Sequence, residues 1–234
     1  MANLADGIVY YIVFLFSTTL HEAAHAWAAK RGGDLTAYHG GQVSLDPRPH
    51  IRREPFGMVA LPILSVLVSG WPFGFASAPY DANWARRHPR RAAWMALAGP
   101  AANLLLLILA AVVINAGVAV DIFHSPESVS FGHVTLASQG GGAMDTVAFV
   151  LGAIFSLNLV LFLLNMLPFP PLDGSSALVL ALPESTVPRY QEFLWGNPAL
   201  GWVGILAAWY VFDYVFQPIF LLAVNLLYPG VTYG

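Results

Sequence analysis

Residues 20–27 read Leu-His-Glu-Ala-Ala-His-Ala-Trp, and they lie inside an apolar stretch that runs from Gly7 to Ala29. A helical membrane span needs about 20 mainly apolar residues, so this stretch is long enough to cross a bilayer. Ionisable side chains are expensive at that depth and by default mark a functional site. The stretch therefore indicates both a membrane fold and the place where its chemistry lies.

The composition of the 234-residue chain supports this interpretation. Its residues are 57% hydrophobic and only 10% charged, whereas a soluble domain has about 45–50% apolar and about 25% charged residues. This low polarity also excludes a disordered chain. The net charge of −3 gives no basic character that would favour nucleic acid as a partner. The absence of cysteine excludes disulfides, thiolate ligands and a thiol nucleophile.

Three further stretches are long and apolar enough to span a membrane, namely Ala92 to Val120, Asp145 to Leu167 and Leu200 to Tyr228. We therefore expect an all-α polytopic membrane protein with about four full transmembrane helices and the lipid bilayer as its solvent. A single integral-membrane domain is expected over residues 1–234. Within it, the catalytic core is predicted at about 7–182 and the C-terminal span at about 199–228.

A fifth apolar stretch, from Phe56 to Pro79, contains internal proline and glycine residues that disfavour one continuous helix. Nine of the ten Lys and Arg residues lie between Lys30 and Arg91, on both sides of this stretch. Basic loops stay in the cytoplasm, and the stretch is too short for two helical crossings. These features favour a re-entrant segment over a kinked fifth span. They also predict an active site that faces the cytoplasm, in a prokaryotic cell membrane.

The Gly-rich segment from Gly33 to Leu45 carries two alternating apolar side chains, Val43 and Leu45. This pattern predicts short β-strands at 33–45 beside the site. An exposed strand edge there would bind an extended peptide by strand addition.

The chemistry starts from the polar residues of the first span. His21 and His25 are four residues apart, so one helical face presents both imidazoles to the same metal ion. Glu22 follows His21 directly and can reach a water molecule beside that ion without being a ligand. Catalytic zinc has three protein ligands and an open position, so a third ligand is required.

The strongest candidate for the third ligand is Asp173, which follows three prolines after the third long span. These prolines prevent a regular helix and hold the chain extended, which lets the carboxylate reach another helix. Topology leaves three histidines of the basic loops open as alternatives, namely His39, His50 and His88. By contrast, His124 and His133 fall in the loop on the opposite side.

Three motifs occur in one order along the chain: His-Glu-x-x-His at 21–25, Gly-Pro-x-x-Asn at 99–103 and Asn-x-x-Pro-x-Pro-Pro-x-Asp-Gly at 165–174. Together they resemble the site-2 protease family of intramembrane zinc metalloproteases, over roughly residues 15–185. The loops are too short for an inserted PDZ-type domain, so the chain is similar to a minimal form.

The resemblance implies Zn²⁺ as cofactor, bound by His21, His25 and Asp173. It implies Glu22 as catalytic base, and a position near the metal for Asn165, with a part in oxyanion binding. The implied activity is hydrolysis of a peptide bond in a transmembrane protein substrate. The polar residues of the first span and the broken backbone near Pro168 indicate a cavity open to the cytoplasm, which predicts a cut near the cytoplasmic end of the substrate span.

Two other functions are weighed against a protease. A divalent-metal transporter needs polar groups along the depth of the bundle, yet 104–113 and 149–155 contain no ionisable residue and only Asp213 departs from this pattern. A non-catalytic scaffold has no need of Glu22. For Asn103 and Asn158, a catalytic role and simple interhelical packing stay equally open.

Overall fold

The computed structural model describes residues 4–234, which fold mainly into helices. Four of these helices are long and apolar enough to cross a membrane: α1 (Leu4–Gly32), α6 (Pro89–Ala119), α7 (Ala143–Met166) and α10 (Ala199–Leu227). Their limits lie within a few residues of the four predicted stretches. The expectation of an all-α polytopic protein with about four spans is confirmed.

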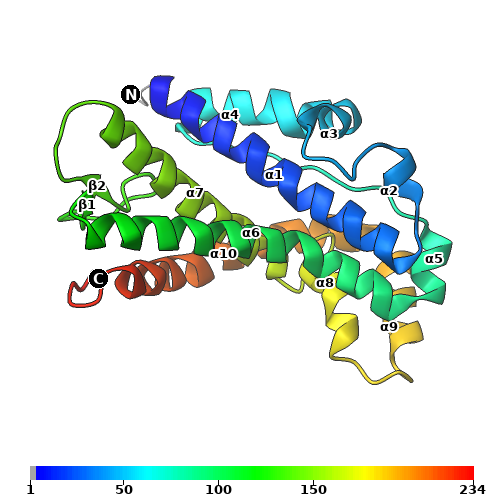
Figure 1. Cartoon of the computed structure of the whole chain (residues 1–234). Coiled ribbons are helices and arrows are strands. Elements are labelled where there is room, and N and C mark those ends of the chain that lie inside the picture. Colours follow the sequence, from blue (N-terminus) through cyan, green and yellow to red (C-terminus); the bar gives the residue numbers. More distant parts are fainter. Residues whose placement is uncertain (1–3) are drawn as a thin grey trace.

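The core of the bundle is formed by α1, α6 and α7 (Figure 1). Buried alanines on α1 (Ala23, Ala26 and Ala29) let the helices approach closely, which is how membrane helices gain packing energy in an apolar solvent. Along the C-terminal half of α6, buried side chains of α6, α7 and α10 form an apolar cluster that includes Ile114 and Phe155.

The stretch from Phe56 to Pro79 folds back on itself. A π-helical turn, η1 (Phe56–Ala60), leads into α4 (Leu61–Ser69), and residues 70–81 then return without regular secondary structure. Gly70 adopts a φ of +85° at the reversal, a left-handed conformation that glycine tolerates best. The N–H of Phe75 donates to the Gly57 carbonyl at 3.1 Å. Both flanks therefore lie at the same end of the bundle, as a re-entrant segment requires.

The prediction of β-strands at 33–45 is wrong. The segment instead forms a helical turn, α2 (Thr36–His39). The Asp34 carboxylate accepts hydrogen bonds from the N–H of Thr36 at 2.9 Å and from its hydroxyl at 2.6 Å. Such local bonds to the backbone favour a turn over a strand. The two short strands among residues 4–234, β1 (Phe123–His124) and β2 (Leu136–Ala137), pair antiparallel beside the C-terminal end of α6.

Short helices complete the chain. At the end that carries most basic residues, hereafter the basic end, α3 (Pro47–Arg53) and α5 (Ala82–Arg87) each start after a capping aspartate. After α7 come α8 (Asp173–Ala177), the 3₁₀ turn η2 (Leu178–Leu180) and α9 (Val187–Gly196). These short helices surround the ends of α1 and α6 in Figure 1.

Candidate metal centre

The two imidazoles of α1 face the same point. The Nε2 atoms of His21 and His25 lie 2.9 Å apart, and both side chains are buried. This follows from their spacing, because residues four apart on a helix lie one above the other. With Glu22 they form a group of three side chains whose ligand atoms all lie within 4.8 Å of one another.

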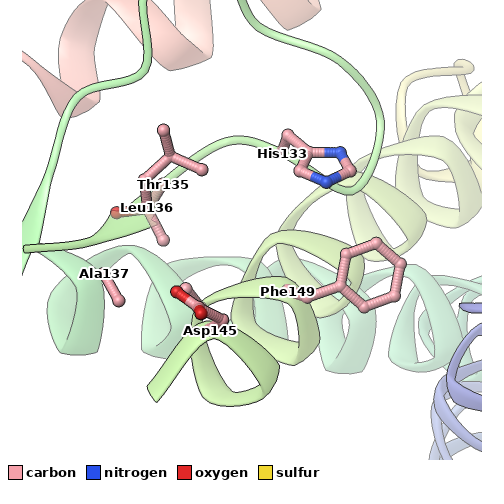
Figure 2. A pocket seen from close by; sticks show the side chains of 7 residues that line it. His133, Thr135, Leu136, Ala137, Asp145 and Phe149 are labelled. Carbon is pink, nitrogen blue, oxygen red and sulfur yellow. The ribbon is translucent and has the colours of Figure 1, made fainter. Parts of the chain in front are cut away.

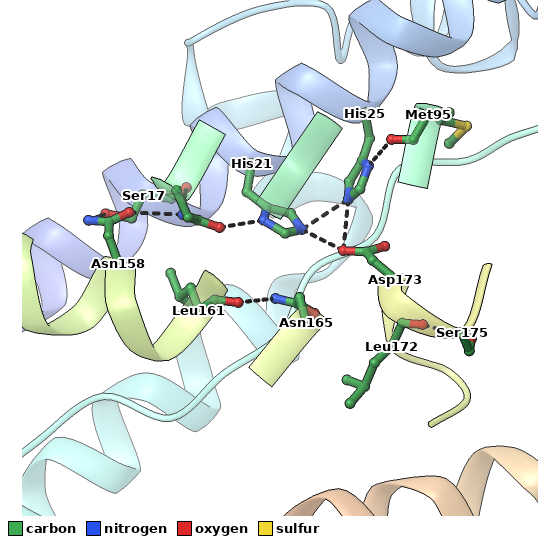
Figure 3. A network of polar contacts seen from close by, with 11 residues as sticks. Ser17, His21, His25, Met95, Asn158, Leu161, Asn165, Leu172, Asp173 and Ser175 are labelled. Atoms are coloured by element: carbon green, nitrogen blue, oxygen red, sulfur yellow. Dashed lines mark hydrogen bonds and ion pairs between the residues drawn. The ribbon is translucent and has the colours of Figure 1, made fainter. Parts of the chain in front are cut away.

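Asp173 joins this pair from a distant part of the chain. Its Oδ2 lies 3.2 Å from Nε2 of His21 and 3.3 Å from Nε2 of His25 (Figure 3). Burial opposes ionisation of this carboxyl, but the two imidazoles lower its pKa below the usual range. Tetrahedral zinc holds N and O ligands at about 2.0–2.2 Å, which separates them from one another by about 3.3–3.6 Å. The three ligand atoms are spaced close to these values.

The Pro-rich segment before Asp173 explains how the carboxylate reaches the histidines. Leu167 and Leu172 have extended backbone conformations on either side of the prolines, so the chain leaves α7 and turns back at α8. A Cβ on Gly174 would collide with the carbonyls of Met166 and Leu167. The glycine therefore lets the start of α8 pack directly on the end of α7.

Each histidine ring is oriented by a hydrogen bond at Nδ1, the ring nitrogen that faces away from Asp173. Nδ1 of His21 lies 2.6 Å from Oδ1 of Asn103, and Nδ1 of His25 lies 2.7 Å from the Met95 carbonyl oxygen. A carbonyl oxygen only accepts, so each Nδ1 carries a hydrogen and each Nε2 is the nitrogen left to bind a metal ion. An Nε2 atom binds a metal ion in its unprotonated form.

Asn103 belongs to a buried chain of amides that joins three helices. Its Nδ2 donates to Oδ1 of Asn158 at 2.9 Å, and Nδ2 of Asn158 donates to the Ser17 hydroxyl at 3.0 Å. All three residues are fully buried and are absent from the lining of the cavity described below. The question left open by the sequence is thus answered in part: Asn103 orients His21, and Asn158 holds Asn103.

Gly99 accounts for another part of the second motif. A Cβ at this position would collide with Nε2 of both His21 and His25. Because glycine has no side chain, α6 passes next to the ligand atoms and leaves space there. Sequence reasoning quoted this glycine without assigning it a role, and it missed Met95, whose contribution is a backbone carbonyl with no side-chain signal.

Glu22 lies beside the histidines with one oxygen unused. The side chain is buried, and its Oε2 has no hydrogen-bond partner among the described residues. An unpaired buried carboxylate oxygen is costly, unless a bound group or water satisfies it. The two imidazoles, the Asp173 carboxylate and this free oxygen together fit a zinc ion with an adjacent base.

Asn165 lies in the wall of the same cavity but contacts its own helix. Its Nδ2 donates to the Leu161 carbonyl at 2.9 Å. A side-chain amide has two N–H groups, so one remains for a ligand in the cavity.

The metal-ligand candidates open into a cavity of about 1220 Å³. Its walls come from α1, α7, α9 and α10 and from the returning chain of the re-entrant segment, where residues 69–78 line it. This volume exceeds that of pockets for small molecules, about 300–1,000 Å³, so an extended peptide segment can be accommodated.

The other histidines lie elsewhere. His50 is buried in α3 with Nε2 at 3.0 Å from the Ser44 carbonyl, and His39 and His88 lie outside the described metal-capable group. At the opposite end, a second cavity of about 230 Å³ is lined by His133 and Asp145 (Figure 2). Asp145 already accepts a hydrogen bond from the N–H of Gly141 at 2.6 Å.

Such a fold and site are typical of a membrane metallopeptidase, in which one helix supplies two histidines and a glutamate. The chain belongs to peptidase family M50, the site-2 protease family, whose model matches residues 9–195. The resemblance seen in the sequence is thereby confirmed.

Curated relatives carry matching names. "Putative zinc metalloprotease YwhC" of Bacillus subtilis is 33% identical over 183 residues, which cover 72% of this chain and 71% of the relative. "Putative zinc metalloprotease Rip2" of Mycolicibacterium smegmatis is 30% identical over 212 residues, with 86% and 71% covered. No solved structure matches the chain significantly. Family and relatives together identify a membrane metalloprotease.

Proposed function

We propose that this protein is a zinc-dependent intramembrane endopeptidase that cuts a transmembrane protein substrate near the cytoplasmic end of its span, in a prokaryotic cell membrane. The observation that carries the proposal is the approach of Asp173 to within 3.3 Å of both imidazole Nε2 atoms, beside a buried glutamate. The cavity that contains these groups is large enough for a peptide.

In this proposal His21, His25 and Asp173 hold the zinc ion. Zinc bound there would polarise the scissile carbonyl and lower the pKa of a water molecule from near 16 towards about 7. Asn103 and the Met95 carbonyl keep both imidazoles in the tautomer that binds the ion. The charged Asp173 contributes the one anionic ligand.

Glu22 is the general base. Its carboxylate takes a proton from the attacking water, whose oxygen adds to the scissile carbonyl carbon. The same proton then passes to the amide nitrogen as the C–N bond breaks, so the products are a carboxylic acid, which afterwards ionises in water, and an amine. The free N–H of Asn165 donates to the oxyanion that develops on the carbonyl oxygen.

A transmembrane helix must unwind before it is cut, because its carbonyls are bonded internally. The returning chain of the re-entrant segment lines the cavity in a non-helical conformation. This chain lies where an extended substrate would run. We therefore assign to it the substrate-binding role that the sequence had suggested for strands at 33–45. The basic end of the bundle, by the distribution of Lys and Arg, faces the cytoplasm.

The test uses a single-span peptide in detergent, with the wild type and Glu22→Gln side by side. Wild type should cut the peptide near its cytoplasmic end, and Glu22→Gln should retain zinc while the rate falls by on the order of 10⁴-fold or more. Mass spectrometry maps the cut and elemental analysis gives the zinc content. Equal behaviour of both proteins, or a cut in the outer third of the span, contradicts the proposal.

A further inference from the structure

Asp213 is an acidic residue that has no part in the proposed mechanism. It is the middle residue of α10 (Ala199–Leu227), a helix long and apolar enough to span the membrane. Its side chain has no ion pair or hydrogen bond with any of the residues that the structure describes, 4–234. A lone carboxylate at the centre of a membrane span is expensive, and such residues mark functional sites.

The position of Asp213 connects it to the metal centre. The cavity of about 1220 Å³ that contains His21, Glu22 and Asp173 is also lined by Asp213. Asp213 therefore borders the space in which a substrate would lie. α10 runs back from the basic end while α1 runs towards it (Figure 1).

The carboxylates in the lining of this cavity are not balanced by Lys or Arg side chains. Its described lining contains four carboxylates, on Glu22, Glu54, Asp173 and Asp213, and no Lys or Arg. The double positive charge of bound zinc would offset two of them, Glu22 and Asp173. Glu54 accepts a hydrogen bond from the Ser77 hydroxyl at 2.6 Å, so Asp213 alone is left with neither a counter-charge nor a donor.

An aromatic wall lies next to this carboxylate. Trp209 is one helical turn before Asp213 on the same face of α10, and both line the cavity. The ring of Phe73, from the re-entrant segment, meets the Trp209 ring edge-on with centroids 6.0 Å apart. A carboxylate and an indole ring that line the same cavity one helical turn apart can recognise Lys or Arg, through an ion pair and a cation–π contact.

We propose that Asp213, with Trp209, forms a subsite that selects transmembrane substrates carrying a Lys or Arg side chain within the segment held in the cavity. This inference rests on the proposed function and names its substrate class.

The test compares two single-span Leu-Ala peptides that differ at one central position, Lys in one and Met in the other. Wild type should cut the Lys peptide about tenfold faster, the scale of a polar contact between membrane helices. In Asp213→Asn this ratio should fall to within about twofold. Asp213→Lys should instead prefer a peptide with Glu at the same position. Asp145→Asn, which changes an acid outside this cavity, is the matched control and should keep the tenfold ratio.

Binding of the same peptides to the inactive Glu22→Gln protein separates this inference from the proposed function. Fluorescence anisotropy should show about tenfold tighter binding of the Lys peptide, and the difference should vanish when Asp213→Asn is added. If no peptide is cut but this difference is present, the protease proposal fails and the subsite stands. A preference that survives Asp213→Asn, or equal handling of both peptides by the wild type in both assays, overturns the subsite. Zinc content and melting temperature of each variant exclude misfolding.

Discussion

The helices α1 and α10 are each 29 residues long, yet they are held in the bundle very differently. In its most apolar window α1 is 56% buried and α10 only 11%. The packed helix carries two of the three ligand candidates and Glu22, the proposed base. The exposed helix forms a wall of the cavity. Chemistry that needs fixed distances is thus placed in the rigid part of the bundle.

The contrast continues within α10 itself. Its second half packs on α6 and α7 through side chains such as Phe220 and Val224. In its first half, Trp202, Leu206 and Trp209 are each at least 70% exposed. The first half also lines the cavity. The half of α10 that lines the cavity is therefore much less packed than the half that lies on α6 and α7.

The largest effect is expected from loss of the ligand that links α8 to α1. Asp173→Asn removes the anionic ligand, so zinc affinity should fall by more than about a hundredfold, beyond the usual effect of outer-shell changes, and cutting should cease. Competition with a chelator measures the affinity. Asp145→Asn is the matched control. Unchanged zinc affinity in Asp173→Asn would show that another group completes the site.

A pair of glycines tests the packing difference directly. In Gly99→Ala the added Cβ meets Nε2 of both histidines, so we expect a loss of zinc and a destabilisation of about 1–3 kcal/mol. In Gly201→Ala, on α10, the new Cβ has no atom within 4 Å, and stability should rise by up to about 1 kcal/mol. Thermal melting in detergent compares the two. Similar melting temperatures would mean that α6 does not lie against the histidines as described.

The smallest of these effects concerns the amide that orients His21. Asn103→Ala removes the acceptor for Nδ1 while the histidine itself remains, so zinc affinity should fall by about 10–100-fold. Asn115→Ala lies on the same helix, but there the amide bonds only the Ala111 carbonyl of its own helix. Its zinc affinity should match that of the wild type. An equal loss in both variants would assign the effect to α6 as a whole.

The spans were predictable because the bilayer demands about 20 apolar residues in each, a requirement that a single sequence displays. The re-entrant segment was predictable for a different reason: basic residues flank it on both sides, which no single crossing satisfies. The approach of Asp173 to the histidine pair also followed from the sequence. The ligand and catalytic roles of these residues remain predictions.

Other features depend on contacts that leave little trace in the sequence. The Met95 carbonyl that orients His25 is a backbone group, and the role of Gly99 appears only once α6 lies against α1. At 33–45 the alternation of Val43 and Leu45 was too short a signal. The local bonds of Asp34 to Thr36 override it and make a turn.

Asp34 also has a consequence for the behaviour of the protein in acid. Besides Thr36, its carboxylate accepts the N–H of Asp81 at 2.8 Å, so one side chain fastens the end of the ligand-bearing helix to the end of the returning chain. Burial acts to raise the pKa of Asp34, but the hydrogen bonds from Thr36 and Asp81 outweigh it and lower the pKa. A carboxyl with a lowered pKa stabilises the fold at neutral pH and loses that contribution only as the pH falls through the lowered value. The link that the Asp34 carboxylate makes to Thr36 and Asp81 therefore persists in mild acid and is lost only in strongly acidic solution.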